Sequence, residues 1–226
     1  MKEKYRVPGE VLLLIVLFVN SMGVEFMTKS GFGISAISSV PYVFSRVFTF
    51  LSFGTWNYIF QTMLVISLMV LSKRISAGYL VSFLVGVGFG KMIDFHSMWM
   101  AYLPTAFTFR CVYFAAGLVC LGGGICIANN CLMPIIPTDM FPRDFSQITK
   151  KKYQNVKTIF DLSCLATTVI LSVVFAGSIM GIGAGTVICS LLTGKLVAMF
   201  QKVFDRYFVV YRAFGFKSSK SKNVAY

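Results

Sequence analysis

The chain has 226 residues, of which 57% are hydrophobic and only 13% are charged, and its formal net charge is +13. Soluble domains carry about a quarter charged residues, so this composition excludes an ordinary water-soluble globule and predicts a protein that lies in a lipid bilayer. The basic residues gather between the apolar runs and show no interleaving with aromatic residues, so no nucleic-acid partner is expected.

Six apolar runs are long enough to cross a bilayer, which takes about 20 residues of helix. The first follows the basic start MKEKYR without a small-residue cleavage site, so we expect an uncleaved first helix. The basic tail from Gln201 onward is expected to be mobile. The six predicted spans are Val11–Met27, Trp56–Leu71, Leu80–Phe95, Phe107–Ala128, Val156–Phe175 and Ile179–Phe200.

Two polar stretches interrupt this pattern, at Gly31–Leu51 and Leu132–Lys152. Both contain proline, and neither is expected to cross the membrane fully, so each is either re-entrant or lies at the membrane surface. Six crossings place both termini on one side, together with Lys73 and the lysines at 150–152. The positive-inside rule then predicts cytoplasmic termini in a bacterial inner membrane, with anionic lipid headgroups against the cytoplasmic face.

An internal repeat relates the two halves of the chain. A shift of 101 positions places Pro41 on Pro142 and Ser38 on Asp139, and a shift of 95 places GVGFG, which begins at Gly86, on the later GIGAG. Each half then has three crossings, and an odd number inserts the two copies in opposite orientations. We therefore predict an all-α, polytopic membrane helix bundle of about six transmembrane helices, built as a 3+3 inverted repeat with Pro-broken segments. The first three-helix repeat is predicted at residues 1–106 and the second at residues 107–204. A basic cytoplasmic tail follows at 205–226.

Three segments also carry a resemblance to a known family. GFGISAISSVPYVFS, LMPIIPTDMFPRDFS and the late GIGAGT together resemble the YczE/YyaS/YitT-type bacterial membrane proteins over nearly the whole chain. The resemblance implies a multispan protein of the bacterial inner membrane. It does not imply a substrate.

Candidate site residues come from the two Pro-containing stretches and from polar groups inside the spans. Polar side chains in a bilayer usually face a cavity or a partner. Asp161 is either a functional group or the i+4 partner of Lys157, and Glu25 either serves a cavity or reaches the headgroups. The candidate substrate-binding residues are Ser38, Ser39, Pro41, Thr138, Asp139, Pro142 and Asp144. The candidate residues for coupling or a polar cavity are Glu25, Gln61, Asp161 and Lys91.

Four glycines form the pairs Gly86/Gly90 and Gly181/Gly185, whose spacing is typical of closely packed membrane helices. No phosphate loop, GxSxG or HExxH motif occurs, and six cysteines without CxxC spacing accompany a single histidine. The sequence therefore predicts no enzyme, no metal site and no cofactor.

Two functions fit these features. The first is a small secondary transporter or exporter of an unidentified small solute, held between the two Pro-containing segments at the repeat interface. The alternative is a binding module without transport of its own, such as a substrate-capturing subunit or an accessory partner in a larger membrane complex. A homo-oligomer or a membrane partner is compatible with either function.

Overall fold

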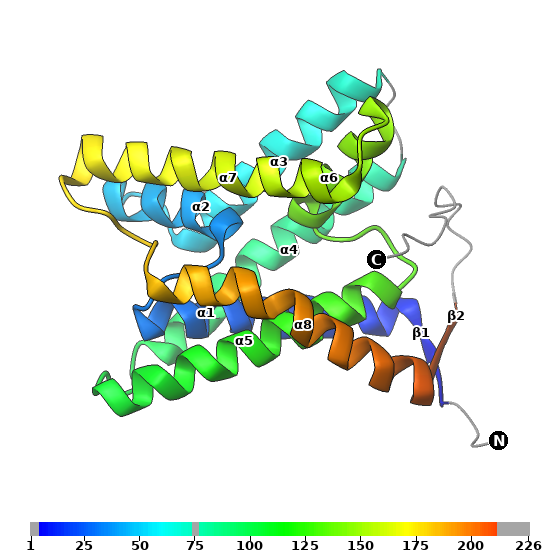
Figure 1. Ribbon diagram of the computed structural model, residues 1–226, viewed down its shortest axis with the longest axis horizontal. Helices are drawn as coiled ribbons and strands as arrows, with labels where there is room; N and C mark the ends of the chain where they lie inside the picture. Colours follow the sequence, from blue (N-terminus) through cyan, green and yellow to red (C-terminus); the bar gives the residue numbers. More distant parts are fainter. Residues whose placement is uncertain (1–4, 74–76, 212–226) are drawn as a thin grey trace.

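The computed structural model describes residues 5–73 and 77–211 of the chain and is almost entirely helical (Figure 1). Within these residues, eight α-helices follow one another, with a one-turn π-helix between the last two and a short strand near each end. The elements are β1 (Tyr5–Pro8), α1 (Gly9–Ser30), α2 (Ala36–Val47), α3 (Phe53–Ser72), α4 (Ala77–Met100), α5 (Phe107–Asn130), α6 (Pro137–Thr149), α7 (Tyr153–Leu171), η1 (Ser172–Ala176), α8 (Ala184–Tyr207) and β2 (Phe208–Tyr211).

Six helices of the described residues are long and apolar enough to cross a membrane, namely α1, α3, α4, α5, α7 with η1, and α8. At 1.5 Å of rise per residue, helices of this length match a hydrocarbon core about 30 Å thick. The expected all-α bundle with six spans is confirmed. The boundaries lie a few residues outside the predicted runs for most spans, because polar residues at the ends still continue the helix.

The two remaining helices, α2 and α6, are short and fall in the two polar stretches. Pro41 and Pro142 lie inside these helices and do not interrupt them. The chain breaks upstream instead, at 31–35 and 131–136, where Gly31 and Leu132 adopt left-handed backbone conformations with φ of 68° and 57°. The prediction that proline breaks these segments is therefore wrong in position. Each proline is the sixth residue of its helix, so it removes one i→i−4 backbone hydrogen bond, but the helix continues through it.

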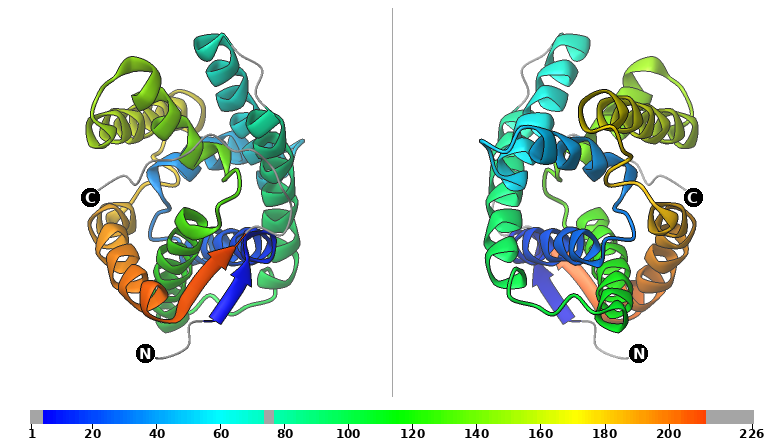
Figure 2. Two further views of the ribbon diagram at one scale, coloured as in Figure 1. Left: turned by 90° about the vertical axis from the view of Figure 1, so that its right-hand side faces the viewer. Right: turned by 90° about the vertical axis from the view of Figure 1, so that its left-hand side faces the viewer.

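The core forms where α1 packs between α4 and α5. Val16 and Met27 on α1, Ile93 on α4 and Leu118 on α5 are almost completely buried there. Helix α8 packs on α5. The two short helices pack on the same two long helices: α2 contacts both α3 and α7, and α6 also contacts both. Seen along the long axis of the molecule, the helices form a ring around its centre (Figure 2).

The two ends of the described chain are tied together by a feature that the sequence analysis did not predict. Strands β1 and β2 pair in parallel, with Tyr5 opposite Phe208 and Pro8 opposite Tyr211. The last span also continues to Tyr207, past the predicted end at Phe200, so part of the expected tail is helix and strand. The remainder of that tail, at 212–226, lies outside the described residues.

The late glycine motif has a different role from the predicted one. Gly181 precedes α8 with φ of 74°, and α8 starts only at Ala184, so Gly181 and Gly185 do not form a helix-packing pair. The motif instead meets the break before α2. There the Ile34 N–H donates to the Gly181 carbonyl at 3.0 Å, and the Gly185 N–H donates to the Phe32 carbonyl at 2.8 Å.

Gly90 marks the closest approach of α3 and α4. A methyl group added there would lie 2.5 Å from the Gly54 carbonyl oxygen and 3.2 Å from Tyr58 Cβ. Gly86, one turn earlier, would meet Gln61 and Pro137. Gly90 therefore lets the backbones of α3 and α4 touch, as small residues do in membrane bundles, and Gly86 leaves room for the side chains of Gln61 and Pro137.

Replacing Gly90 with alanine is expected to force α3 and α4 apart and to destabilise the protein by roughly 1–3 kcal/mol, the usual cost of overpacking. Gly194→Ala is the matched control, because nothing lies within 4 Å of a Cβ at that helical position. Thermal unfolding in detergent, followed by tryptophan fluorescence, should show a lower Tm for Gly90→Ala only. Equal Tm values for the two variants would contradict the close crossing.

Candidate functional site

A cavity with a volume of about 1360 Å³ lies at the centre of the ring. Every one of the eight α-helices of the described residues contributes to its wall, and so does the break before α6. Pockets for drug-sized ligands usually measure about 300–1,000 Å³. The cavity is therefore large enough for an organic molecule and far larger than a bare ion needs.

The two short helices both begin at this cavity. Ser35 caps α2, and its Oγ accepts a hydrogen bond from the Ser38 N–H at 3.4 Å while donating to Ser38 Oγ at 2.9 Å. Helix α6 begins at Pro137 without a side-chain cap, but it carries Asp139 in its first turn. The positive end of a helix dipole attracts negative charge, so Asp139 compensates the start of its own helix.

Charged side chains line the cavity on the side of α6 and α7. Arg143 Nε donates to Asp144 Oδ1 at 2.9 Å, and Lys157 Nζ donates to Asp161 Oδ1 at 2.7 Å. The i+4 pairing considered for Asp161 is thus present, and Asp161 also faces the cavity. These four residues form two neutral pairs.

Asp139 differs from these paired acids. Within residues 5–73 and 77–211 no ion pair or hydrogen bond holds its carboxylate, which is partly accessible from the cavity. A carboxylate that faces a cavity without an ion pair is a candidate ligand-binding or coupling group.

Side-chain amides make up the deep wall. Asn20 is only 4% exposed, lines the cavity, and has an Oδ1 without a hydrogen-bond partner among the described residues. Asn57 Oδ1 accepts from Gln61 Nε2 at 2.5 Å. A buried amide oxygen without a partner costs free energy, so Asn20 is a group that a bound ligand or a water molecule would satisfy.

A second amide pair joins α5 to α8 at the edge of the cavity. Asn130 Nδ2 donates to Gln201 Oε1 at 2.8 Å, and Gln201 Nε2 donates back to Asn130 Oδ1 at 3.2 Å. Gln201 Nε2 also donates to Asp205 Oδ1 at 2.7 Å. This chain of hydrogen bonds fixes Asp205 at the cavity wall.

Five of the predicted candidates meet at the cavity. Ser38, Thr138, Asp139 and Asp144 come from the two Pro-containing stretches, and Asp161 comes from α7. The sequence analysis did not single out Arg143 or Asp205 as site residues. Both resemble ordinary interfacial charges in the sequence, and only the fold brings them to the cavity wall.

Other candidates lie away from the cavity. Ser39 is fully buried, and its hydroxyl bonds Thr168 Oγ1 on α7 at 2.7 Å, so it ties α2 to α7. Pro41 and Pro142 are buried inside their short helices, and Gln61 lies behind Asn57. Lys91 is exposed on the outer surface of α4.

Glu25 occupies a separate, smaller pocket. It is 5% exposed and therefore does not reach the lipid headgroups, which was one of its two expected roles. The pocket measures about 250 Å³ and is otherwise lined mainly by polar residues, including Arg46, Ser52 and Ser97. It lies near the C-terminal end of α1 and shares no lining residue with the large cavity.

Comparison with known proteins gives a family without an assigned activity. A family model described as a family of unknown function, DUF6198, matches residues 7–202. The uncharacterized protein YyaS of Bacillus subtilis (strain 168) is 24% identical over 203 residues, which cover 86% of this chain and 93% of that protein. The resemblance to YyaS-type proteins seen in the sequence is confirmed. No solved structure matches the chain.

Asn20 holds its position because Gly124 on α5 has no side chain. A methyl group at Gly124 would overlap Asn20 Oδ1, whereas one at the adjacent Gly123 would meet only Phe200 at 3.9 Å. We expect Gly124→Ala to lower stability by roughly 1–3 kcal/mol and Gly123→Ala to leave it nearly unchanged. Thermal unfolding of the two variants measures the difference. A Gly124→Ala protein as stable as Gly123→Ala would show that Asn20 is not held in the cavity wall.

Proposed function

This chain belongs to the family of unknown function DUF6198, and we propose that it is a small secondary transporter whose binding site is the central cavity. The chain is a multi-pass membrane protein with six long apolar helices. The single observation that carries the proposal is that the two short helices α2 and α6, one from each half of the chain, begin at one cavity.

The directions of the helices support an inverted repeat. Figure 1 shows α1, α3 and α4 each running opposite to α5, α7 and α8, their counterparts in the second half. Helices α2 and α6 both start near the middle of the molecule and run toward opposite ends. Discontinuous helices that begin near the bilayer midplane, one from each inverted half, form the substrate sites of many secondary transporters.

The packing of the helices supports the same arrangement. Helix α1 packs on α4 as α5 packs on α8, and α2 packs on α7 as α6 packs on α3. Landmarks of the two breaks recur at the spacing of 101 that relates Pro41 to Pro142. They are the left-handed residues Gly31 and Leu132 and the N-cap residues Ser35 and Ile136.

The halves differ in one respect that matters for transport. In the first half α3 and α4 pack along each other, whereas in the second half α7 and α8 stand on separate parts of the cavity wall without extensive contact in the described residues. One molecule therefore contains both a closed and an open version of the same unit. Exchange of the two versions would open the cavity on the other side, which is alternating access between inverted repeats.

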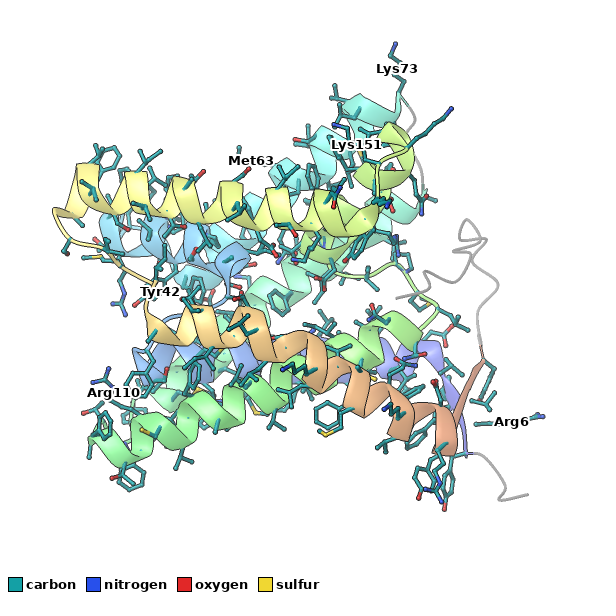
Figure 3. All side chains as sticks on the ribbon, viewed as in Figure 1. Arg6, Tyr42, Met63, Lys73, Arg110 and Lys151 are labelled. Atoms are coloured by element: carbon teal, nitrogen blue, oxygen red, sulfur yellow. The ribbon has the colours of Figure 1, made fainter. Side chains whose placement is uncertain are left out.

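The present cavity reaches one end of the molecule. Its lining includes Tyr79 near the start of α4, Gln147 near the end of α6 and Asp205 near the end of α8. Figure 3 shows Lys73 and Lys151 at the same end of the molecule. The labelled Arg6 lies at this end too, and Arg110 at the other. By the positive-inside rule we assign the basic end, with both termini, to the cytoplasm, so the structure corresponds to an inward-facing state in a bacterial inner membrane.

Access to the cavity tests this proposal. A cysteine replacing Ser38 should react with a membrane-impermeant thiol reagent from both sides of the membrane in oriented vesicles, because transport requires both states. Mass spectrometry identifies which cysteine carries the label, so the six native cysteines need not be replaced. Tyr102→Cys, 91% exposed in the wild type, should react only from outside, and Lys151→Cys only from inside.

The outcomes separate the two candidate functions. Reaction at position 38 from one side only, with both markers behaving as expected, would contradict transport and favour a binding module that serves a larger complex. Labelling of Lys151→Cys from outside would contradict the inverted topology itself.

A further inference from the structure

We infer that the central cavity selects an organic cation, that is, a protonated amine or quaternary ammonium group attached to an apolar body. This inference deepens the proposed function and rests on the cavity being the transport site. It starts from the distribution of charge between the cavity and the rest of the chain.

The cavity carries negative charge in a strongly basic protein. The whole chain has 21 Lys and Arg residues against 8 Asp and Glu residues. Four of those eight acids line the cavity, but only two basic residues do so among the described part of the chain. The acids are Asp139, Asp144, Asp161 and Asp205, and the basic residues are Arg143 and Lys157.

Ion pairs neutralise two of the four acids that line the cavity, so the other two carry the excess negative charge. Arg143 and Lys157 are each paired with an aspartate at hydrogen-bond distance, so neither is free to attract an anion. In the described part of the chain neither Asp139 nor Asp205 forms an ion pair, and Asp205, which is exposed at the cavity edge, accepts a hydrogen bond from the Gln201 amide. Opposite charges attract more strongly where water is partly excluded, so the partly buried Asp139 makes the cavity favour a cation.

The helix starts do not reverse this preference. The first turn of α2 is capped by Ser35, and that of α6 contains Asp139 itself, so both positive ends are already compensated. Asn20 adds an independent sign of a ligand, because it is 96% buried and its Oδ1 has no partner in the described structure. An amide oxygen can accept a hydrogen bond from an ammonium group.

The remaining wall explains why an organic cation is favoured over a metal ion. Phe60, Tyr79, Phe89 and Tyr153 place aromatic side chains at the cavity, with Leu121 and Ile125 beside them. Aromatic faces attract ammonium groups, and aliphatic side chains bind the apolar part of a ligand. The described residues also contain no cluster of three or more His, Cys, Asp or Glu suited to a metal ion.

The test uses two water-soluble probes with the same ring and opposite charge, benzyltrimethylammonium and benzenesulfonate. Calorimetric titration of the purified protein in detergent should show saturable binding of the ammonium probe and none of the sulfonate. Asp139→Asn should weaken binding of the ammonium probe by about tenfold or more, because losing a close opposite charge costs roughly 1.4 kcal/mol of binding free energy. Glu10→Gln, which removes the same charge from a position outside the cavity, should bind like the wild type.

Each other outcome would overturn the inference. Tighter binding of benzenesulfonate would show that the cavity selects anions, and equal affinity of Asp139→Asn and Glu10→Gln would remove Asp139 from the site. Binding of neither probe would also refute the inference. Because this is an equilibrium measurement, a cation that binds while position 38 is accessible from one side only would refute transport but not the choice of ligand.

Discussion

The fold depends on satisfying backbone polar groups where the chain is not helical at membrane depth. A bilayer supplies no hydrogen bonds, so a break in a helix survives there only if protein or a water-filled cavity covers it. The break before α2 is covered by the start of α8, through the bonds of Ile34 to Gly181 and of Gly185 to Phe32. The break before α6 is covered by α4, where Ser82 Oγ donates to the Ile135 carbonyl at 2.5 Å. Each break is thus stabilised by a long helix from the opposite half.

This mutual covering explains why the cavity and the fold are inseparable. Each short helix must begin inside the protein, and its start needs polar surroundings that lipid cannot offer. The two starts meet at a shared cavity, and the polar residues that solvate them line its wall. Asn20, Ser38 and Asp139 lie at this junction. Four acids but only two basic residues of the described part line the cavity, so its wall is formally negative although the chain has a net charge of +13.

Hydropathy and the positions of proline and glycine predict much of this architecture but not its contacts. The apolar runs predict six spans because lipid imposes their length. The spacing between Pro41 and Pro142 predicts two equivalent short segments, although not that the chain breaks several residues before each proline. The spacing of Gly181 and Gly185 is compatible with either helix packing or an extended crossing. Only the hydrogen bonds to Phe32 and Ile34 in the break before α2 decide between them. Asp205 and Arg143 join the site through tertiary packing, which leaves no signal in the local sequence.

The central claim is that the two halves exchange open and closed arrangements around one site. Double electron–electron resonance in liposomes measures this directly, with one spin-label pair on Ile159 and Met199 of α7 and α8 and a second on Met63 and Phe95 of α3 and α4. All four side chains are more than half exposed, so labels there should not disturb the core. The account predicts two distance populations for each pair, with the α7–α8 pair becoming shorter under the conditions in which the α3–α4 pair becomes longer. A single, unchanging distance for both pairs would contradict it.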